Sequence, residues 1–138
     1  MQQSEGRSIA VSSQILLAED EVLIRHDLAQ RLRLAGYAVV EARNAEEAMT
    51  LLAAVTAPLL LITDVRMGGA FDGVRLARLA RQQNPAIKII VMSGHLTETR
   101  GLDLADAAFA KPFDMAGMLA KVQDLIGLAG DGREQEVA

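Results

Sequence analysis

The chain has few of the features that would stabilise or anchor a protein by means other than packing. It contains no cysteine, which excludes disulfides, thiolate metal sites and cysteine nucleophiles. No apolar run reaches the roughly 18 residues of a membrane-spanning helix, and no apolar signal segment follows Met1. We therefore expect a cytoplasmic protein that makes no membrane contact and depends on its core.

The chain also has fewer basic than acidic side chains. The 138 residues include 14 basic and 18 acidic side chains, giving a net charge of -4 and a pI near 5.1. A general attraction to nucleic acid is therefore not expected, and we predict no direct contact with it. The 51% of hydrophobic residues is enough for one core, and the length favours a single domain.

Five short apolar runs alternate with longer periodic segments. This alternation is typical of βαβ units that build a parallel sheet. Three of the runs are almost wholly apolar, as expected for strands covered by helices on both faces. The predicted strands are Ile15–Ala18, Tyr37–Val40, Leu59–Ile62, Ile87–Met92 and Ala107–Ala110.

Four of the periodic segments predict helices with one apolar stripe each. Asp114 is placed to cap the last helix and Gly127 to end it. The stripes are Ile24, Leu28 and Leu32; Ala45, Ala48, Leu52 and Val55; Gly73, Leu76, Ala77 and Ala80, with Arg75, Arg78 and Arg81 outward; and Met115, Met118, Leu119, Val122, Leu125 and Ile126.

A fifth segment, Leu96–Leu104, is a poor helix sequence. It contains Gly101 and two β-branched threonines, without a sustained stripe, so we expect a short or mobile helix there. The polar ends predict disorder over residues 1–13 and 129–138, with one domain at 14–128.

Polar side chains gather where the predicted strands end. In an open parallel sheet, ligands bind beyond the carboxyl ends of the strands. Carboxylates from two strands form an oxygen-rich site suited to Mg²⁺, with Mn²⁺ also possible, and a carboxylate is a competent nucleophile for phosphoryl transfer. The residues at these ends are Glu19, Asp20, Glu21, Thr63, Asp64, Ser93 and Lys111.

Four segments at these strand ends resemble the motif set of response-regulator receiver domains, over about Gln14 to Leu128. The resemblance implies a three-layer, flavodoxin-like (βα)5 fold with a five-stranded parallel sheet in the order 2-1-3-4-5. The segments are ILLAEDE at 15–21, TDVRM at 63–67, VMSG at 91–94 and FAKPF at 109–113.

The same resemblance implies a role for each matching residue. Asp64 would accept phosphate from the phosphohistidine of a histidine kinase or a phosphotransfer protein. Ser93 and Lys111 would bind the phosphoryl group, and the Lys111–Pro112 peptide bond would be cis. The metal ligands would be Asp20, Asp64, the backbone carbonyl of Arg66 and, through water, Glu19.

Two departures from the family pattern affect the surface that is expected to communicate phosphorylation to a partner. The aromatic residue usually found three positions before the lysine is Ala108 here, and alternation along the strand should point Phe109 to the opposite face. The stretch from Ser93 to Lys111 is also about one helical turn shorter than usual. We therefore expect the phosphorylation chemistry to be kept and its readout to be altered.

Other interpretations stay open at this level. Glu19 and Asp20 are also suited to capping the first helix. A degenerate receiver would bind partners without phosphorylation. A true phosphatase would need a second acidic residue at position 66, where Arg66 stands. We expect no enzyme activity beyond self-catalysed phosphotransfer and autodephosphorylation, an unknown downstream target protein, and a monomer or weak homodimer.

Overall fold

Strands and helices alternate along most of the described part of the chain. The computed structural model describes residues 14–54, 58–68, 72–94 and 102–129, and no helix among them is long and apolar enough to span a membrane. The elements are β1 (Gln14–Ala18), α2 (Val22–Leu34), β2 (Ala38–Ala42), α3 (Ala45–Ala54), β3 (Leu60–Asp64), α4 (Gly73–Gln83), β4 (Lys88–Ser93), β5 (Ala107–Ala110) and α5 (Met115–Ile126).

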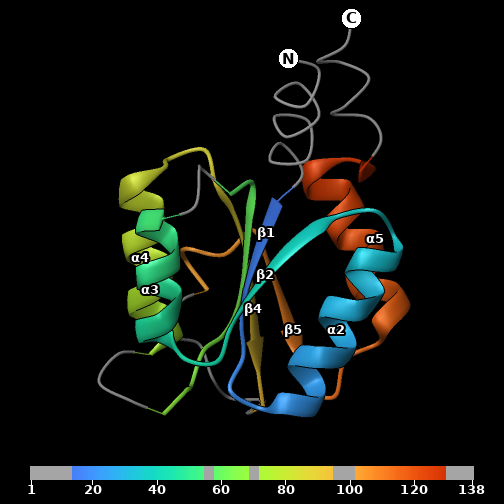
Figure 1. Ribbon diagram of the computed structural model, residues 1–138, viewed down its shortest axis with the longest axis horizontal. Coiled ribbons are helices and arrows are strands. Elements are labelled where there is room, and N and C mark those ends of the chain that lie inside the picture. The colour runs from blue at the N-terminus through green and yellow to red at the C-terminus, as the bar shows by residue number, and fades with distance from the viewer. Residues whose placement is uncertain (1–13, 55–57, 69–71, 95–101, 130–138) are drawn as a thin grey trace, which may run out of the picture.

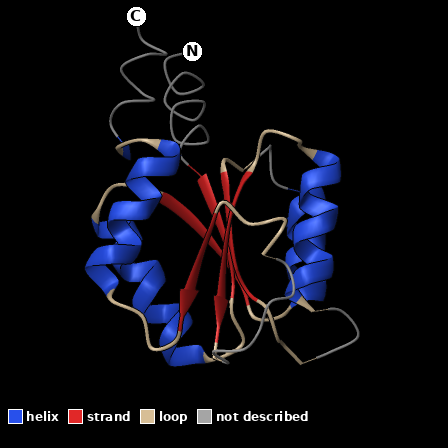
Figure 2. Ribbon diagram, turned by 180° about the vertical axis from the view of Figure 1, so that it is seen from behind, coloured by secondary structure: helices blue, strands red, loops and turns tan. Residues whose placement is uncertain are grey.

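The five strands form one parallel sheet in the order β2-β1-β3-β4-β5. Helices α2 and α5 cover one face of the sheet, and α3 and α4 cover the other (Figures 1 and 2). The predicted strand order and three-layer architecture are confirmed. Because neighbouring strands are parallel, their carboxyl ends meet at one edge of the sheet.

The sheet separates two apolar cores. Side chains alternate between its faces, so Leu16 and Leu61 pack against α3 and α4, whereas Ile15 and Ile62 pack against α2 and α5. All four side chains are buried, and burying a side chain of this size contributes roughly 1.5–3 kcal/mol. All residues of β3 are buried, which fixes the strand that carries Asp64.

Helix α5 begins and ends where the sequence predicts. The Asp114 side chain accepts a hydrogen bond from the Gly117 N–H at 2.9 Å. Gly127 ends the helix with φ of 82°, a conformation that glycine adopts without steric cost. Of the predicted stripe, Met118 and Val122 are fully buried and the other four residues are partly buried.

Most of the segment expected to form a short or mobile fifth helix, Leu96–Leu104, lies outside the described residues, and its last three residues, 102–104, form a turn. The ends expected to be disordered, 1–13 and 129–138, also lie outside the described residues, except for Ala129. The described part of the chain contains the four helices α2 to α5.

Arg81 does not point outward as predicted for the exposed face of α4. Its guanidinium donates to the carbonyl of Leu104 at 3.1 Å and to the Asp106 carboxylate at 3.2 Å. The same carboxylate oxygen accepts the backbone N–H of Ile89 at 2.8 Å. Asp106 thereby joins α4 and β4 at the entrance of β5.

The segment that follows α5 packs against the start of β2. The Tyr37 hydroxyl donates to the carbonyl of Gly127 at 2.6 Å. Ala129, one residue beyond the expected end of the domain, is buried and packs against Gly36. These contacts lie at the start of β2, at the edge of the sheet opposite to the strand ends that carry the polar residues.

Candidate functional site

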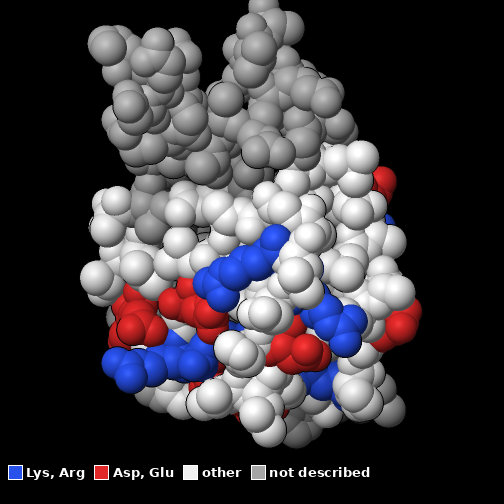
Figure 3. Space-filling view, turned by 45° about the vertical axis from the view of Figure 1, so that its right-hand side comes forward, with Lys and Arg blue, Asp and Glu red and all other residues white. Residues whose placement is uncertain are grey.

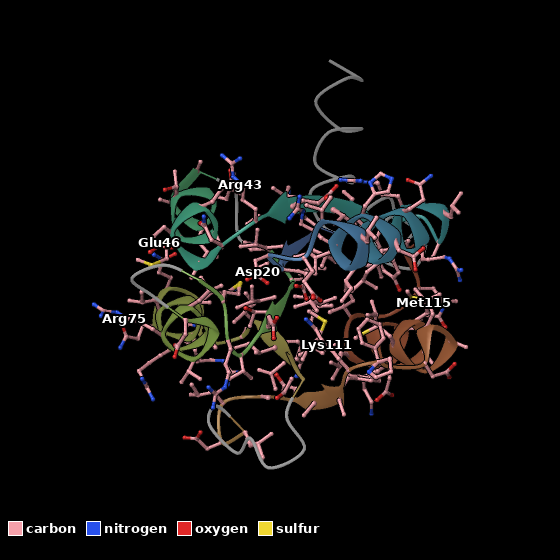
Figure 4. All side chains as sticks on the ribbon, turned by 90° about the horizontal axis from the view of Figure 1, so that it is seen from below. Asp20, Arg43, Glu46, Arg75, Lys111 and Met115 are labelled. Carbon is pink, nitrogen blue, oxygen red and sulfur yellow. The ribbon has the colours of Figure 1, made fainter. Side chains whose placement is uncertain are left out.

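Four charged side chains from three strand ends converge at the carboxyl edge of the sheet. Glu19 and Asp20 follow β1, Asp64 ends β3, and Lys111 follows β5. In the view onto this edge, Asp20 and Lys111 lie in the middle, between the two helix layers (Figure 4). The structure thus brings together the acidic residues and the lysine that the sequence placed at strand ends.

Lys111 lies at the centre of these acidic groups. Its Nζ is 2.6 Å from Oε1 of Glu19 and 2.8 Å from Oδ2 of Asp64. Its side chain is only 13% exposed, so both ion pairs are largely shielded from water. Pairs of this kind are stronger than surface salt bridges, which contribute about 0–1 kcal/mol.

Three carboxylates are close enough to share one cation. Glu19, Asp20 and Asp64 each offer an oxygen atom, and these atoms lie within 4.8 Å of one another. Glu19 and Asp64 are buried and Asp20 is exposed. An oxygen-only donor set with one ligand open to solvent suits a hard divalent cation that retains some of its water.

The electrostatics of the site also favour an added positive charge. Burial raises the pKa of the Asp64 carboxyl, and although the Lys111 ammonium opposes this shift, the negative charge of Asp20 reinforces it. Burial likewise raises the pKa of Glu19. Burial acts to lower the pKa of Lys111, but Asp64 and Glu19 outweigh it and raise that pKa. The two buried carboxylates are therefore incompletely neutralised by one ammonium.

Backbone contacts fix the position of Asp64. The Val65 N–H donates to the carbonyl of Met92 at 2.8 Å, and the Gly73 N–H donates to the carbonyl of Val65 at 2.9 Å. A Cβ atom on Gly73 would overlap the backbone carbonyl oxygen of Asp64. Only glycine fits there, because α4 begins directly against the strand end that carries Asp64.

Glu19 takes part in the predicted capping of the first helix, whereas Asp20 does not. Glu19 Oε2 accepts the backbone N–H of Glu21 at 2.8 Å, and Glu21 is the N-cap residue of α2 without a capping bond of its own side chain. Asp20 is instead 3.5 Å from the Gly68 N–H in the loop after β3. Glu19 therefore orients the start of α2 as well as pairing with Lys111.

The two remaining predicted site residues, Ser93 and Arg66, are less buried than Asp64. Ser93 is half-buried at the end of β4, and its backbone carbonyl accepts the N–H of Lys111 at 2.7 Å. Arg66 is exposed, and its backbone N–H donates to Asp64. The Lys111–Pro112 peptide bond is cis, as the resemblance implied. We call the open cleft lined by Asp20, Glu21, Ile24, Asp64, Arg66, Gly94, Lys111 and Pro112 the acidic pocket.

Gly73 and Arg25 support this pocket, but neither was predicted from the sequence to have a functional role. Gly73 was assigned only to the inner face of its helix. Arg25 donates to the backbone carbonyl of Glu19 at 2.9 Å and pairs with Glu41 at 3.3 Å. The close contact of Gly73 could have been suspected from the sequence, because a glycine stands in the first helical turn after a polar strand end. The sequence does not indicate the contacts of Arg25, because its partners are set by the packing of α2 on β2.

Comparison with known proteins agrees with this geometry. The family model of the response regulator receiver domain matches residues 15–123. The transcriptional regulatory protein PdtaR of Mycobacterium tuberculosis is 35% identical over 118 residues, covering 83% of this chain and 57% of that protein. The chain spans about half the length of the curated relatives it matches.

Solved receiver structures have the same fold. A CheY-like receiver protein from Methanospirillum hungatei aligns with a TM-score of 0.77 at 25% identity, over 90% of this chain and 98% of that chain. The response regulator TrrA of Thermotoga maritima, solved in complex with Mg²⁺-BeF, aligns with a TM-score of 0.74 at 29% identity, over 82% and 98%. With these similarities and the acidic pocket at the predicted strand ends, the chain belongs to the response regulator receiver domains.

Proposed function

We propose that Asp64 accepts a phosphoryl group from a phosphohistidine, in a reaction that depends on a divalent cation, and that this switches partner binding. The observation that carries the proposal is the arrangement around Asp64: its buried carboxylate lies 2.8 Å from an ammonium and shares a cluster with two further carboxylates. Attraction to Lys111 and repulsion within the cluster together prepare the pocket for an anionic group accompanied by a cation.

The chemistry requires little rearrangement. A carboxylate oxygen of Asp64 forms a bond to phosphorus as the bond from phosphorus to the donor imidazole breaks, and the released imidazole nitrogen takes a proton. Lys111 Nζ, now between Glu19 and Asp64, pairs with the phosphoryl oxygens. The hydroxyl of Ser93 donates a further hydrogen bond to them, because β4 ends beside β3.

A divalent cation fits the residues that are present. Asp20 and Asp64 would bind it directly, Glu19 through water and Arg66 through its backbone carbonyl. When bound, Mg²⁺ or Mn²⁺ supplies positive charge that offsets the phosphoryl oxygens. The raised pKa values of Asp64 and Glu19 support this, since the buried carboxylates lack enough cationic partners.

We propose that the only reactions this chain catalyses are its own phosphorylation and dephosphorylation. Arg66 stands two residues after Asp64, where a phosphatase with an aspartyl nucleophile would carry its acid/base. Hydrolysis of the aspartyl phosphate would therefore rely on water that enters the open acidic pocket. The chain acts as a phosphorylated switch or relay and turns over no added phosphate ester.

A second hollow adjoins the acidic pocket and suits a protein donor. It is largely apolar, and Ile24, Lys111 and Pro112 line both hollows. Its rim carries Leu23, which is 83% exposed. We propose that the histidine kinase or phosphotransfer protein docks here, because a donor seated on this hollow brings its phosphohistidine next to Asp64.

Surface charge argues for protein partners over nucleic acid. Acidic and basic side chains are interspersed on the face seen in Figure 3, without one extended basic area. With a net charge of -4, direct contact with nucleic acid is not part of the proposal, and the downstream target would be a protein.

The test is phosphorylation by a small donor. Wild type, Asp64→Asn and Asp124→Asn are incubated with phosphoramidate and Mg²⁺, and the mass of the intact protein is measured. Asp124 is an exposed acidic residue of α5, so its variant controls for the loss of one charge. We expect the mass of one phosphoryl group in wild type and Asp124→Asn, and none in Asp64→Asn.

Other outcomes separate the rivals. Absence of any mass gain, together with partner binding that Asp64→Asn leaves intact, would establish a degenerate receiver. A gain in Asp64→Asn equal to that of wild type would place the phosphate elsewhere. Sustained release of phosphate from added esters would establish a phosphatase.

A further inference from the structure

Glu21 lines the acidic pocket, but its side chain neither belongs to the carboxylate cluster nor caps α2. Its backbone is fixed, since its N–H donates to Glu19 and its carbonyl accepts the N–H of Arg25 at 2.9 Å. Its side chain makes no capping bond and is 62% exposed. The Glu21 carboxylate is thus a charge at the pocket that neither metal binding nor helix capping accounts for.

That carboxylate faces the group that would bind phosphate. Glu21 Oε1 lies 3.7 Å from Lys111 Nζ, on the solvent side of the two buried pairs that Lys111 makes with Glu19 and Asp64. Both Glu21 and Asp64 line the acidic pocket. A donor that reaches Asp64 from solvent therefore passes close to the Glu21 charge.

The charge balance shows what Glu21 contributes. Four ionised carboxylates, those of Glu19, Asp20, Glu21 and Asp64, stand against the Lys111 ammonium and the Arg66 guanidinium, for a net charge of -2. One divalent cation makes the pocket neutral, and without Glu21 the same loaded pocket would carry a charge of +1. Glu21 therefore decides whether an incoming anion meets a neutral or an attractive pocket.

We propose that Glu21 is a specificity-determining residue that disfavours dianionic small-molecule phosphodonors relative to donors of lower charge. This inference rests on the proposed phosphorylation of Asp64 and adds selectivity to it. Because the charge is exposed, it acts on free dianions such as acyl phosphates. A protein donor offsets it with the apolar contacts of the neighbouring hollow.

The experiment compares two donors of different charge. Phosphorylation rates of wild type, Glu21→Gln and Asp124→Asn are measured by intact mass at saturating Mg²⁺, with acetyl phosphate as dianion and phosphoramidate as the donor of lower charge. Glu21→Gln should speed the reaction with acetyl phosphate about 3- to 10-fold, and that with phosphoramidate by about the square root of that factor, roughly 2- to 3-fold, because the electrostatic energy is proportional to the donor charge. Asp124→Asn, which removes the same charge from distant α5, should change neither.

Three further measurements distinguish selectivity from a structural effect. The gain with acetyl phosphate should shrink as salt is raised, because exposed charges are screened. Glu21→Ser, which places a favoured N-cap residue on α2, should reproduce the gain even if Glu21→Gln folds poorly. The Mg²⁺ dissociation constant, from a spectroscopic titration, should change less than about threefold.

Each contrary outcome has a definite meaning. Equal changes with both donors would overturn the inference and leave the proposed function intact. A tenfold weaker Mg²⁺ affinity would make Glu21 a metal ligand and also overturn it. If wild type takes phosphate from neither donor, the proposed function fails and the inference fails with it.

Discussion

The acidic pocket and the β4–β5 edge belong to one sheet but differ in how tightly they are held. Asp64 ends a strand that is buried throughout, and its carboxylate and backbone are fixed by Lys111, the contact of Gly73 and the backbone of β4. In β5, Ala108 and Ala110 are exposed, and the strand entrance depends on Asp106. The pocket that the proposal assigns to receiving phosphate is thus held more tightly than the entrance of β5.

Gly73→Ala should produce the largest effect on the pocket side. The added methyl group meets the backbone carbonyl of Asp64, which cannot move without displacing β3. We expect the free energy of unfolding, measured in urea, to fall by more than about 3 kcal/mol, with phosphorylation strongly slowed. Gly68→Ala is the control, because nothing lies within 4 Å of its added Cβ. Equal losses in both variants would contradict the close contact.

Lys111→Met should come next. It leaves the buried carboxylates of Glu19 and Asp64 without their ammonium, and the metal-free protein should lose about 2–4 kcal/mol of unfolding free energy at neutral pH. The loss should diminish in acid, where both carboxylates become protonated, and it should also diminish when Mg²⁺ is added. A loss that is independent of both pH and Mg²⁺ would show that the stem of Lys111 matters more than its charge.

Arg81→Ala tests the β4–β5 edge. Removing the guanidinium breaks its hydrogen bonds to Leu104 and Asp106, so we expect a loss of about 1–2 kcal/mol in chemical denaturation. The rate of phosphorylation by phosphoramidate should stay within about twofold of wild type. Lys121→Ala, which removes an exposed pair at 3.5 Å, should cost less than about 0.5 kcal/mol. A large drop in the phosphorylation rate of Arg81→Ala would show that the acidic pocket depends on the β4–β5 edge.

Asp64→Asn should have the smallest effect, and a stabilising one, in metal-free protein. The pKa of Asp64 is raised in the folded state, so the folded protein binds the Asp64 proton more tightly than the unfolded chain does. The contribution of this proton to folding stability is complete below the pKa of an unfolded aspartate, near 4, and is lost as pH rises through the folded pKa. At neutral pH the charge is a cost, and the amide removes it, for a gain of about 1 kcal/mol.

The pH and metal dependence check the sign of that effect. The advantage of Asp64→Asn should vanish at pH values below about 4. Excess Mg²⁺ should reverse the order of stability, because wild type would bind the cation and the variant would bind it less well. Thermal unfolding with chelator or Mg²⁺ measures both, and a variant less stable than wild type in chelator at neutral pH would contradict the raised pKa.

The sequence predicted the sheet well because its signal is local. Apolar runs bounded by polar residues marked all five strands, and their order followed from the family resemblance. The convergence of Glu19, Asp20, Asp64 and Lys111 followed from the rule that parallel strands end at one edge. Single residues with local roles, such as Asp114 and Gly127, were also predicted.

The remaining features depend on contacts that no local pattern encodes. Arg81 lies on the polar side of its helix and was predicted to face solvent, but Asp106, 25 positions later, provides its partner. The contact of Gly73 with Asp64 depends on how closely α4 approaches β3. The role of the Leu96–Leu104 segment in the readout falls largely outside the described residues and stays a prediction.

Contacts between the segment after α5 and the start of β2 place both ends of the described chain on the side of the sheet opposite to the acidic pocket. Tyr37 and Gly36 hold Gly127 and Ala129 at the edge of the sheet where β1 begins at Gln14, and the five residues of β1 separate that edge from the acidic pocket by about 15 Å. A tether fixed at either end of the described chain would leave the pocket facing outward. Immobilised protein should thus remain open to donors, whichever end is anchored.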